Sequence, residues 1–179
     1  MTPGEIVYVI GPSGAGKDSV IAFARAASDP ARVAFAHRYI TRPALPDAEN
    51  HIALSPAEFD ARRQAGWFAL HWQSHGLAYG IGCEIESWRA SGMRVVINGS
   101  RAHLPEAFAR YPDLLPVLVS APAEIRQARL RARNRESLDD IARRLDRQIE
   151  AMTEHPRMVT IDNGGTLEAA GTALLKLLG

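Results

Sequence analysis

The sequence predicts an α/β fold, with a parallel β-sheet covered by helices on both faces. Short apolar runs alternate along the chain with segments of helical periodicity. The runs at 6–10, 93–98 and 115–120 are rich in β-branched and other apolar residues, as strands buried on both faces are. Strands separated by helices are joined by crossovers and therefore pair in parallel.

Each element follows from its own pattern. The predicted strands are 6–10, 32–36, 67–72, 76–81, 93–98, 115–120 and 158–161. The predicted helices are 20–27, 55–65, 83–91, 101–110, 121–131, 138–153 and 166–178. A helix is predicted to start at Ser55, the N-cap, with Pro56 at the first helical position and Glu58 three residues after the cap. Gly66 ends that helix. The two strands that follow predict a small lobe, with Trp67, Phe68 and Trp72 in its core.

A glycine-rich turn follows the first strand. Gly11, four residues and then Gly16-Lys17 is the P-loop spacing. The glycines let successive backbone N–H groups point at a phosphate, and the next helix adds its positive end. Lys17 brings a charge to the β- and γ-phosphates. The residues predicted to bind a nucleotide, by default ATP, are Gly11, Pro12, Ser13, Gly14, Ala15, Gly16, Lys17, Asp18 and Ser19.

Asp18 stands where P-loops usually have a Ser or Thr whose hydroxyl contacts Mg²⁺. A carboxylate also ligates Mg²⁺, so Asp18 is the predicted metal ligand and the Ser19 hydroxyl is the alternative. The strand ending at Asn98 lacks the aspartate that often serves the metal there, which favours Asp18.

The composition limits the classes of function that the chain can have. The 179 residues, 46% hydrophobic and 23% charged, suit one soluble domain. The net charge of +1 argues against a general nucleic-acid binder. The single Cys83 excludes an internal disulfide and suits a reducing compartment. No apolar run is long enough for a membrane span, and signal-peptide features are absent, so we expect a cytoplasmic protein without nucleic-acid or membrane partners. The oligomeric state is left open.

The order of motifs resembles the guanylate kinase family over nearly the whole chain. The matching segments are the P-loop, Ile40-Thr41-Arg42-Pro43, the stretch with Phe68, Trp72, His75-Gly76 and Tyr79-Gly80, and Asp162-Asn163. The resemblance implies a P-loop kinase fold with a core (1–36 and 92–179), a substrate lobe at about 37–91 and an arginine-rich lid at about 131–137. It also implies that Asn163 lies beside the adenine of the nucleotide.

The departures from that family concern the acceptor. Guanylate kinases have a second acceptor arginine where this chain has Leu45, and a tyrosine near the position of His51. Their guanine-reading carboxylates are missing from the segments 69–73 and 96–100. A site that reads a base by hydrogen bonds loses that recognition when the partner groups are deleted. We therefore expect a phosphorylated acceptor that need not be a purine nucleotide.

The same segments, together with Glu49-Asn50-His51, resemble the ribose 1,5-bisphosphate phosphokinase family, associated with bacterial phosphonate breakdown. That resemblance implies conversion of ribose 1,5-bisphosphate and ATP to 5-phosphoribosyl 1-diphosphate and ADP. The residues alone imply only ATP-dependent phosphorylation of a phosphate group. The alternatives are a guanylate kinase or other nucleoside monophosphate kinase and, from another class, a non-catalytic guanylate-kinase-like binding module.

The predicted acceptor-binding residues are Arg38, Arg42, Glu49, His51, Tyr79, Asn98 and Ser100. Arg38 and Arg42 present forked donors in a polar loop, although arginines in such loops are often simply solvated. Tyr79 matches a family phosphate contact. Asn98 and Ser100 end the central strand, where ligands collect in α/β sheets.

Arginines alternate at positions 129, 131, 133 and 135. Such a run usually marks a solvated helix face, but arginines on a closing lid neutralise a transferring phosphoryl group and exclude water. The resemblance matches Arg133 and Arg144 to lid and following-helix arginines, so the predicted catalytic residues are Lys17, Arg133 and Arg144. A phosphate oxygen is already a nucleophile, so no side-chain base is predicted.

Overall fold

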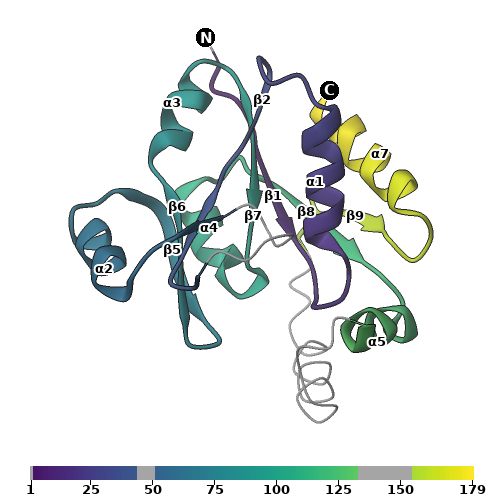
Figure 1. Ribbon diagram of the computed structural model, residues 1–179. Coiled ribbons are helices and arrows are strands. Elements are labelled where there is room, and N and C mark those ends of the chain that lie inside the picture. The colour runs from purple at the N-terminus through teal and green to yellow at the C-terminus, as the bar shows by residue number, and fades with distance from the viewer. Residues whose placement is uncertain (1, 44–50, 133–154) are drawn as a thin grey trace. The chain divides into compact units, whose positions relative to one another are not determined.

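The computed structural model describes residues 2–43, 51–132 and 155–179 (Figure 1). The predicted α/β fold is confirmed, because helices flank a five-stranded sheet with the strand order β2-β7-β1-β8-β9. A second sheet has the order β4-β3-β6-β5. Glu49, Arg133, Arg144, the predicted helix 138–153 and most of the predicted lid lie outside the described residues.

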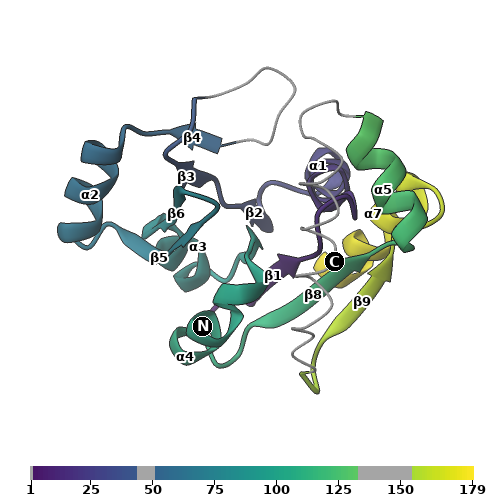
Figure 2. The same cartoon turned by 90° about the horizontal axis from the view of Figure 1, so that it is seen from below.

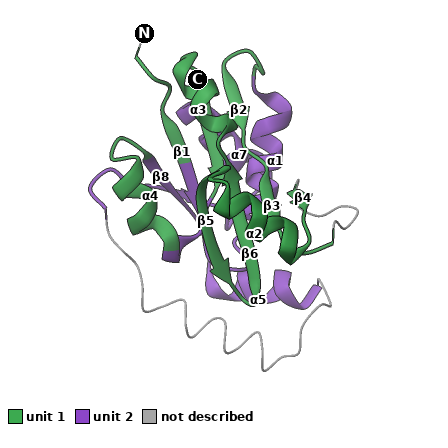
Figure 3. Ribbon diagram, turned by 90° about the vertical axis from the view of Figure 1, so that its left-hand side faces the viewer, with its two compact units in different colours: residues 1–7, 29–98, 103–114 green, residues 8–28, 99–102, 115–179 purple. Residues whose placement is uncertain are grey.

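The chain forms two compact units (Figure 3). Unit 1 contains residues 1–7, 29–98 and 103–114, and unit 2 contains residues 8–28, 99–102 and 115–179. The boundary falls inside β1 (Ile6–Ile10), whose five residues are all buried. These units divide the chain differently from the predicted core and lobe, whose bounds stay a prediction.

Unit 2 carries the glycine-rich turn and the elements packed around it. Parallel strands β8 (Leu115–Ser120) and β9 (Val159–Asp162) lie side by side. Helices α1 (Lys17–Ala27) and α7 (Leu167–Leu178) pack together, and α5 (Ala123–Ala132) follows β8 (Figure 1). The helix predicted over 20–27 begins three residues earlier, directly after the turn, which places Lys17 at its first position.

Unit 1 carries parallel strands β2 (Val33–Phe35) and β7 (Arg94–Asn98) and the whole second sheet. The strands of that sheet are β3 (Arg38–Ile40), β4 (His51–Ala53), β5 (Phe68–Ser74) and β6 (Leu77–Gly82). Helix α2 (Pro56–Gln64) lies against β5 (Figure 2), where Phe59 stacks on Phe68 with ring centroids 4.7 Å apart. The Ser55 side chain accepts a hydrogen bond from the Glu58 N–H, as the capping pattern predicts.

The remaining helices of the described chain are α3 (Glu84–Ala90) and α4 (Leu104–Arg110). The helix predicted over 101–110 is divided: a 3₁₀ turn, η1 (Arg101–His103), precedes α4. Pro105 lies in the first turn of α4, the part of a helix where a residue without an N–H fits best. No helix among the described residues is long and apolar enough to cross a membrane.

Three sequence-based predictions about unit 1 are wrong. Arg38 begins strand β3 instead of lying in a loop, and no strand was predicted at His51–Ala53. Strands of three residues are too short for an alternating pattern, and β3 and β4 exist because they pair with each other and with β6. Trp67, predicted in the lobe core, is 58% exposed, whereas Phe68 and Trp72 are buried as predicted.

Candidate active site

The P-loop of unit 2 is shaped by its backbone. Gly14 and Gly16 have φ angles of 80° and 82°, in the left-handed region that glycine adopts at no steric cost. A Cβ atom on Gly14 would lie 2.6 Å from the Arg126 carbonyl oxygen. The Ala15 N–H donates to the Pro12 carbonyl oxygen at 3.1 Å and closes the turn. The loop therefore has the curvature that a phosphate-binding cradle requires.

Asn163 braces this loop. Its Nδ2 donates to the Ala15 carbonyl oxygen at 2.7 Å, and a Cβ on Gly16 would lie only 2.4 Å from that nitrogen. Its backbone N–H donates to the Ser120 carbonyl oxygen at 2.7 Å, which ties the loop to the end of β8. The buried Oδ1 has no hydrogen-bond partner within the described ranges. The predicted contact of Asn163 with the nucleotide stays a prediction.

Arg129 is a second brace, which sequence reasoning missed. From α5, its Nη1 donates to the Ala15 carbonyl oxygen at 3.3 Å and its Nη2 to the Asn163 carbonyl oxygen at 2.9 Å. The Ala15 carbonyl oxygen thus accepts hydrogen bonds from two side chains, which hold the path of the loop between Gly14 and Gly16. Within the alternating arginines, Arg131 is exposed and Arg129 is not.

Lys17 and Asp18 lie together at the start of α1. The Lys17 Nζ is 3.4 Å from the Asp18 Oδ1, and the side chains are 14% and 43% exposed. Within the described part of the chain, no group of three His, Cys, Asp or Glu residues could hold a metal ion. Mg²⁺ in nucleotide sites is held by one or two carboxylates together with phosphate and water oxygens, so a single accessible carboxylate fits it.

Ser100 is held in unit 2 by a residue that the sequence did not single out. The buried Tyr8 hydroxyl accepts from the Ser100 N–H at 3.1 Å and donates to the Ser100 carbonyl oxygen at 3.3 Å. Gly99 lies against the Tyr8 ring, where a Cβ atom would come within 2.3 Å. The only signal in the sequence was the glycine before Ser100. Asn98, at the end of β7 in unit 1, is buried.

Unit 1 brings three predicted acceptor residues onto one face of the second sheet. Arg38 pairs with His51 across β3 and β4, and Trp72 pairs with Tyr79 across β5 and β6. Paired residues share a face, and the Arg38 Cζ lies 5.3 Å from the centre of the Tyr79 ring. We call this face, defined by Arg38, His51, Trp72 and Tyr79, the acceptor face.

Arg42 lies two residues after the end of β3, and its neighbour Thr41 is tied to β6. The Thr41 Oγ1 accepts from the Ala78 N–H at 2.8 Å, and the Thr41 N–H donates to the Ala78 carbonyl oxygen at 3.1 Å. The His51 Nε2 is 3.4 Å from the Arg42 carbonyl oxygen. Thr41 thus joins β3 to β6, and the backbone of Arg42, the next residue, lies beside His51 of the acceptor face.

Comparison with known proteins gives the family. A curated relative named ribose 1,5-bisphosphate phosphokinase PhnN, from Thiobacillus denitrificans, is 53% identical over 99% of this chain and 94% of its own. Relatives of the same name from Desulfomicrobium baculatum and Burkholderia pseudomallei are 52% and 49% identical, over 97% and 99% of this chain and 94% and 97% of their own. The chain belongs to the ribose 1,5-bisphosphate phosphokinase family. No protein-family model matches it.

Solved structures agree on the fold. Guanylate kinase from Anaplasma phagocytophilum superposes with a TM-score of 0.69 at 15% identity, over 99% of this chain and 86% of that one. A gluconokinase from Sinorhizobium meliloti has a TM-score of 0.50 at 21% identity, over 99% and 94%. At these identities the likeness concerns the fold alone, which the phosphokinase family shares with guanylate kinase.

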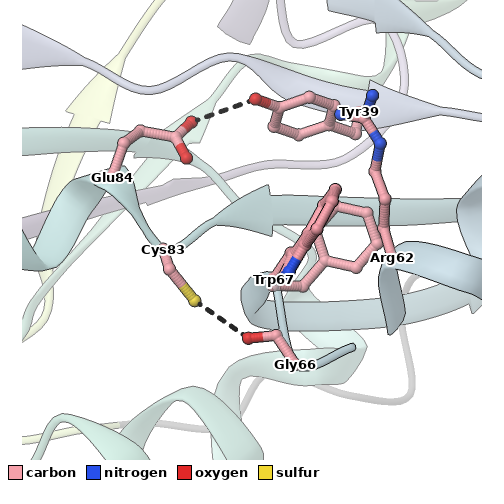
Figure 4. Close-up of a pocket in the computed structure, with 7 residues that line it drawn as sticks. Tyr39, Arg62, Gly66, Trp67, Cys83 and Glu84 are labelled. Atoms are coloured by element: carbon pink, nitrogen blue, oxygen red, sulfur yellow. Dashed lines mark hydrogen bonds between the residues drawn. The ribbon is translucent and has the colours of Figure 1, made fainter. Parts of the chain in front are cut away.

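The opposite face of the second sheet carries a cavity of about 240 Å³ (Figure 4). The side chains of Tyr39, Arg62, Trp67, Cys83 and Glu84 line it, and none of the predicted acceptor residues within the described ranges does. The Tyr39 hydroxyl donates to the Glu84 Oε1 at 3.5 Å, and burial, with the Glu84 carboxylate, raises the pKa of Tyr39. Tyr39 neighbours Arg38 in β3 and therefore points to the other face.

Two further arginines of unit 2, Arg101 and Arg126, interact electrostatically. Burial and the charge of Arg126 both lower the pKa of Arg101 below its ordinary value. The backbone of Arg126 lies beside Gly14 of the P-loop. Sequence reasoning missed this pair, because Arg101 and Arg126 lie 25 positions apart on different elements.

Proposed function

We propose that this chain transfers the γ-phosphoryl group of ATP to the C1 phosphate of ribose 1,5-bisphosphate. The products are 5-phospho-α-D-ribose 1-diphosphate and ADP, and the reaction serves phosphonate breakdown in the cytoplasm. The observation that carries this proposal is the 53% identity, over nearly the full length of both chains, to a relative with that name. The missing guanine-reading carboxylates support the same acceptor.

The nucleotide is assigned to unit 2. Residues 11–19 bind the phosphates of ATP, with Lys17 beside the transferring group, and Asn163 lies next to the adenine. The carboxylate of Asp18 holds Mg²⁺ directly or through water. When bound, Mg²⁺ neutralises charge on the phosphate oxygens of the nucleotide. The braced Ala15 carbonyl and the accessible Asp18 side chain support this assignment.

The acceptor is assigned to residues of the second sheet and of the strand end after β7. Arg38, Arg42 and Tyr79 hold the phosphates through forked and hydroxyl donors. The candidates for the ribose hydroxyls or a phosphate are Glu49, His51, Asn98 and Ser100. The common face of Arg38, His51 and Tyr79 supports the grouping.

The chemistry needs alignment and charge neutralisation. An anionic oxygen of the C1 phosphate attacks the γ-phosphorus of ATP, the bond from that phosphorus to the β,γ-bridging oxygen breaks, and ADP leaves. No proton is removed from the acceptor, so no base is required. Lys17, Arg133 and Arg144 stabilise the charge on the transferring group.

Product analysis tests the proposal. The protein is mixed with ATP and Mg²⁺ and with either ribose 1,5-bisphosphate or GMP, and the products are separated by anion-exchange chromatography and identified by ³¹P NMR. Formation of the 1-diphosphate alone supports the proposal. GDP as the main product, or no product from ribose 1,5-bisphosphate, would refute it. The Lys17→Ala protein controls for contaminating kinases.

A further inference from the structure

Trp72 is the centre of a stack of rings on the acceptor face. Its indole lies parallel to the Tyr79 ring, with an angle of 3° and centroids 5.5 Å apart. It also stacks on the His103 imidazole, at 5.3 Å and 26°. Trp72 is only 9% exposed, so its surface is largely used by contacts within the protein.

The stack leads to the predicted phosphate contacts. Tyr79 contacts Trp72 and lies under the Arg38 guanidinium, 5.3 Å from ring centre to Cζ. A guanidinium over a ring is attracted to its electron-rich face, so the orientation of the ring sets where the guanidinium rests. A hydrogen bond also holds the backbone next to Tyr79, because the Ala78 N–H donates to the Thr41 Oγ1.

His103 supports the far end of the stack. Its side chain is 13% exposed, with Nδ1 3.7 Å from the Glu106 Oε2. Burial lowers the pKa of His103, His71 acts in the same direction and Glu106 opposes them. A neutral imidazole is a good stacking partner for an indole. The buried Nε2 has no hydrogen-bond partner among the residues that the structure describes, while the ring itself stacks on Trp72.

We propose that Trp72 is a positioning residue for the phosphate acceptor. Backed by His103, its indole fixes the plane of the Tyr79 ring and, through that ring, the position of the Arg38 guanidinium. This inference rests on the proposed function, because it takes Arg38 and Tyr79 as acceptor ligands. It adds a residue that touches neither the acceptor nor the nucleotide.

The test compares two tryptophans of the same lobe. Trp72→Leu removes the stack but keeps an apolar side chain, Trp72→Phe keeps a ring, and Trp67→Leu is the matched control at an exposed position. For each, KM for ribose 1,5-bisphosphate, KM for ATP and kcat are measured on protein whose circular dichroism matches the unmodified chain. We expect Trp72→Leu to raise the acceptor KM roughly tenfold with the ATP KM nearly unchanged. Trp72→Phe restores most of the affinity, and Trp67→Leu changes neither KM.

A double-mutant cycle separates positioning from general support of the lobe. If Trp72 acts through Tyr79, Trp72→Leu has little further effect on the acceptor KM in a Tyr79→Leu background. If Trp72→Leu does not fold, His103→Leu takes its place, with an expected rise of about threefold. Equal changes in both KM values, or additive effects of the two substitutions, overturn the inference. No turnover of ribose 1,5-bisphosphate by the unmodified protein overturns the proposed function, and the inference with it.

Discussion

The P-loop of unit 2 and the acceptor face of unit 1 are built by different means. The P-loop is a backbone structure, in which left-handed glycines set the path and the Ala15 carbonyl is held by Asn163 and Arg129. The acceptor face is a side-chain structure, in which residues from separate short strands meet through pairing and ring contacts. The P-loop depends on local backbone conformation, whereas the acceptor face depends on the register of the paired strands.

This difference determines how each region fails. In the P-loop an added methyl group meets backbone or buried amide atoms that cannot move away cheaply. On the acceptor face a substitution removes a donor or a ring while the strands remain paired. We therefore expect P-loop changes to abolish turnover and acceptor-face changes to alter the affinity for one substrate.

The largest expected effect belongs to Lys17→Ala. Removing the positive charge that Lys17 places beside the transferring phosphoryl group lowers kcat roughly 10²–10³-fold or more. The Lys17 side chain is 14% exposed and lies at the first position of α1, where alanine is well tolerated, so the fold should survive. Steady-state kinetics and circular dichroism check this, and near-normal turnover would contradict the role of the P-loop.

Gly16→Ala and Gly76→Ala form a matched pair that sharpens the comparison. Both glycines have positive φ, 82° and 73°, so both variants pay roughly 1–2 kcal/mol of backbone strain. Only at Gly16 would the new Cβ meet an atom, the Asn163 Nδ2 at 2.4 Å, whereas nothing lies within 4 Å at Gly76. We expect Gly16→Ala to lose ATP binding and Gly76→Ala to keep it, measured by titration calorimetry. Similar ATP affinities would contradict the backbone account.

Arg42→Ala tests the acceptor side. If the guanidinium grips a phosphate, the KM for ribose 1,5-bisphosphate rises by about tenfold to a hundredfold, because a charge-assisted pair is lost. The KM for ATP should hardly change. Arg63→Ala is a control on an exposed helix face, where the Arg63 Nε lies 3.3 Å from the Asp60 Oδ1. A defect confined to ATP would move Arg42 out of the acceptor site.

Arg129→Ala should weaken ATP binding by about tenfold, since two hydrogen bonds that hold the Ala15 and Asn163 carbonyls are lost. Arg131→Ala, two residues along the same helix at an exposed position, is the matched control. Titration with a fluorescent ATP analogue measures both. Equal losses would mean that the general charge of α5, and not the brace, supports the nucleotide.

The sequence predicts the P-loop well because its chemistry is local. The spacing of Gly11, Gly16 and Lys17 within seven residues is enough to define the turn, whereas its braces, Arg129 and Asn163, come from elements more than 110 residues away. Arg38, His51 and Tyr79 were predicted as acceptor residues, but their common face was not predicted. Arg38 was expected in a loop, since only the pairing of β3 with β4 and β6 reveals its strand. Trp67 was wrongly expected in the core of the lobe. Hydrophobicity alone does not tell which of the two neighbouring aromatic residues, Trp67 or Phe68, faces solvent.

The smallest effect concerns Tyr111, a buried tyrosine of unit 1 that belongs to neither the P-loop nor the acceptor face. The Tyr111 hydroxyl donates to the Glu86 Oε1 at 2.5 Å, and burial, followed by this hydrogen bond, raises the pKa of Tyr111 to about 12. The unfolded chain loses this proton near pH 10, so the stabilisation is complete below about pH 10 and is lost as the pH rises toward 12.

Urea unfolding between about pH 8 and about pH 12 tests this titration. The free energy of unfolding of the unmodified protein should fall through the upper part of the range, and Tyr111→Phe should make that fall shallower because the titrating hydroxyl is gone. ATP affinity at neutral pH should be the same in both proteins, since this support belongs to unit 1 while the nucleotide is assigned to the backbone cradle of unit 2. An unchanged slope would mean that Tyr111 titrates equally in the folded and unfolded chains, and a loss of ATP affinity would break the independence of the two regions on which the comparison rests.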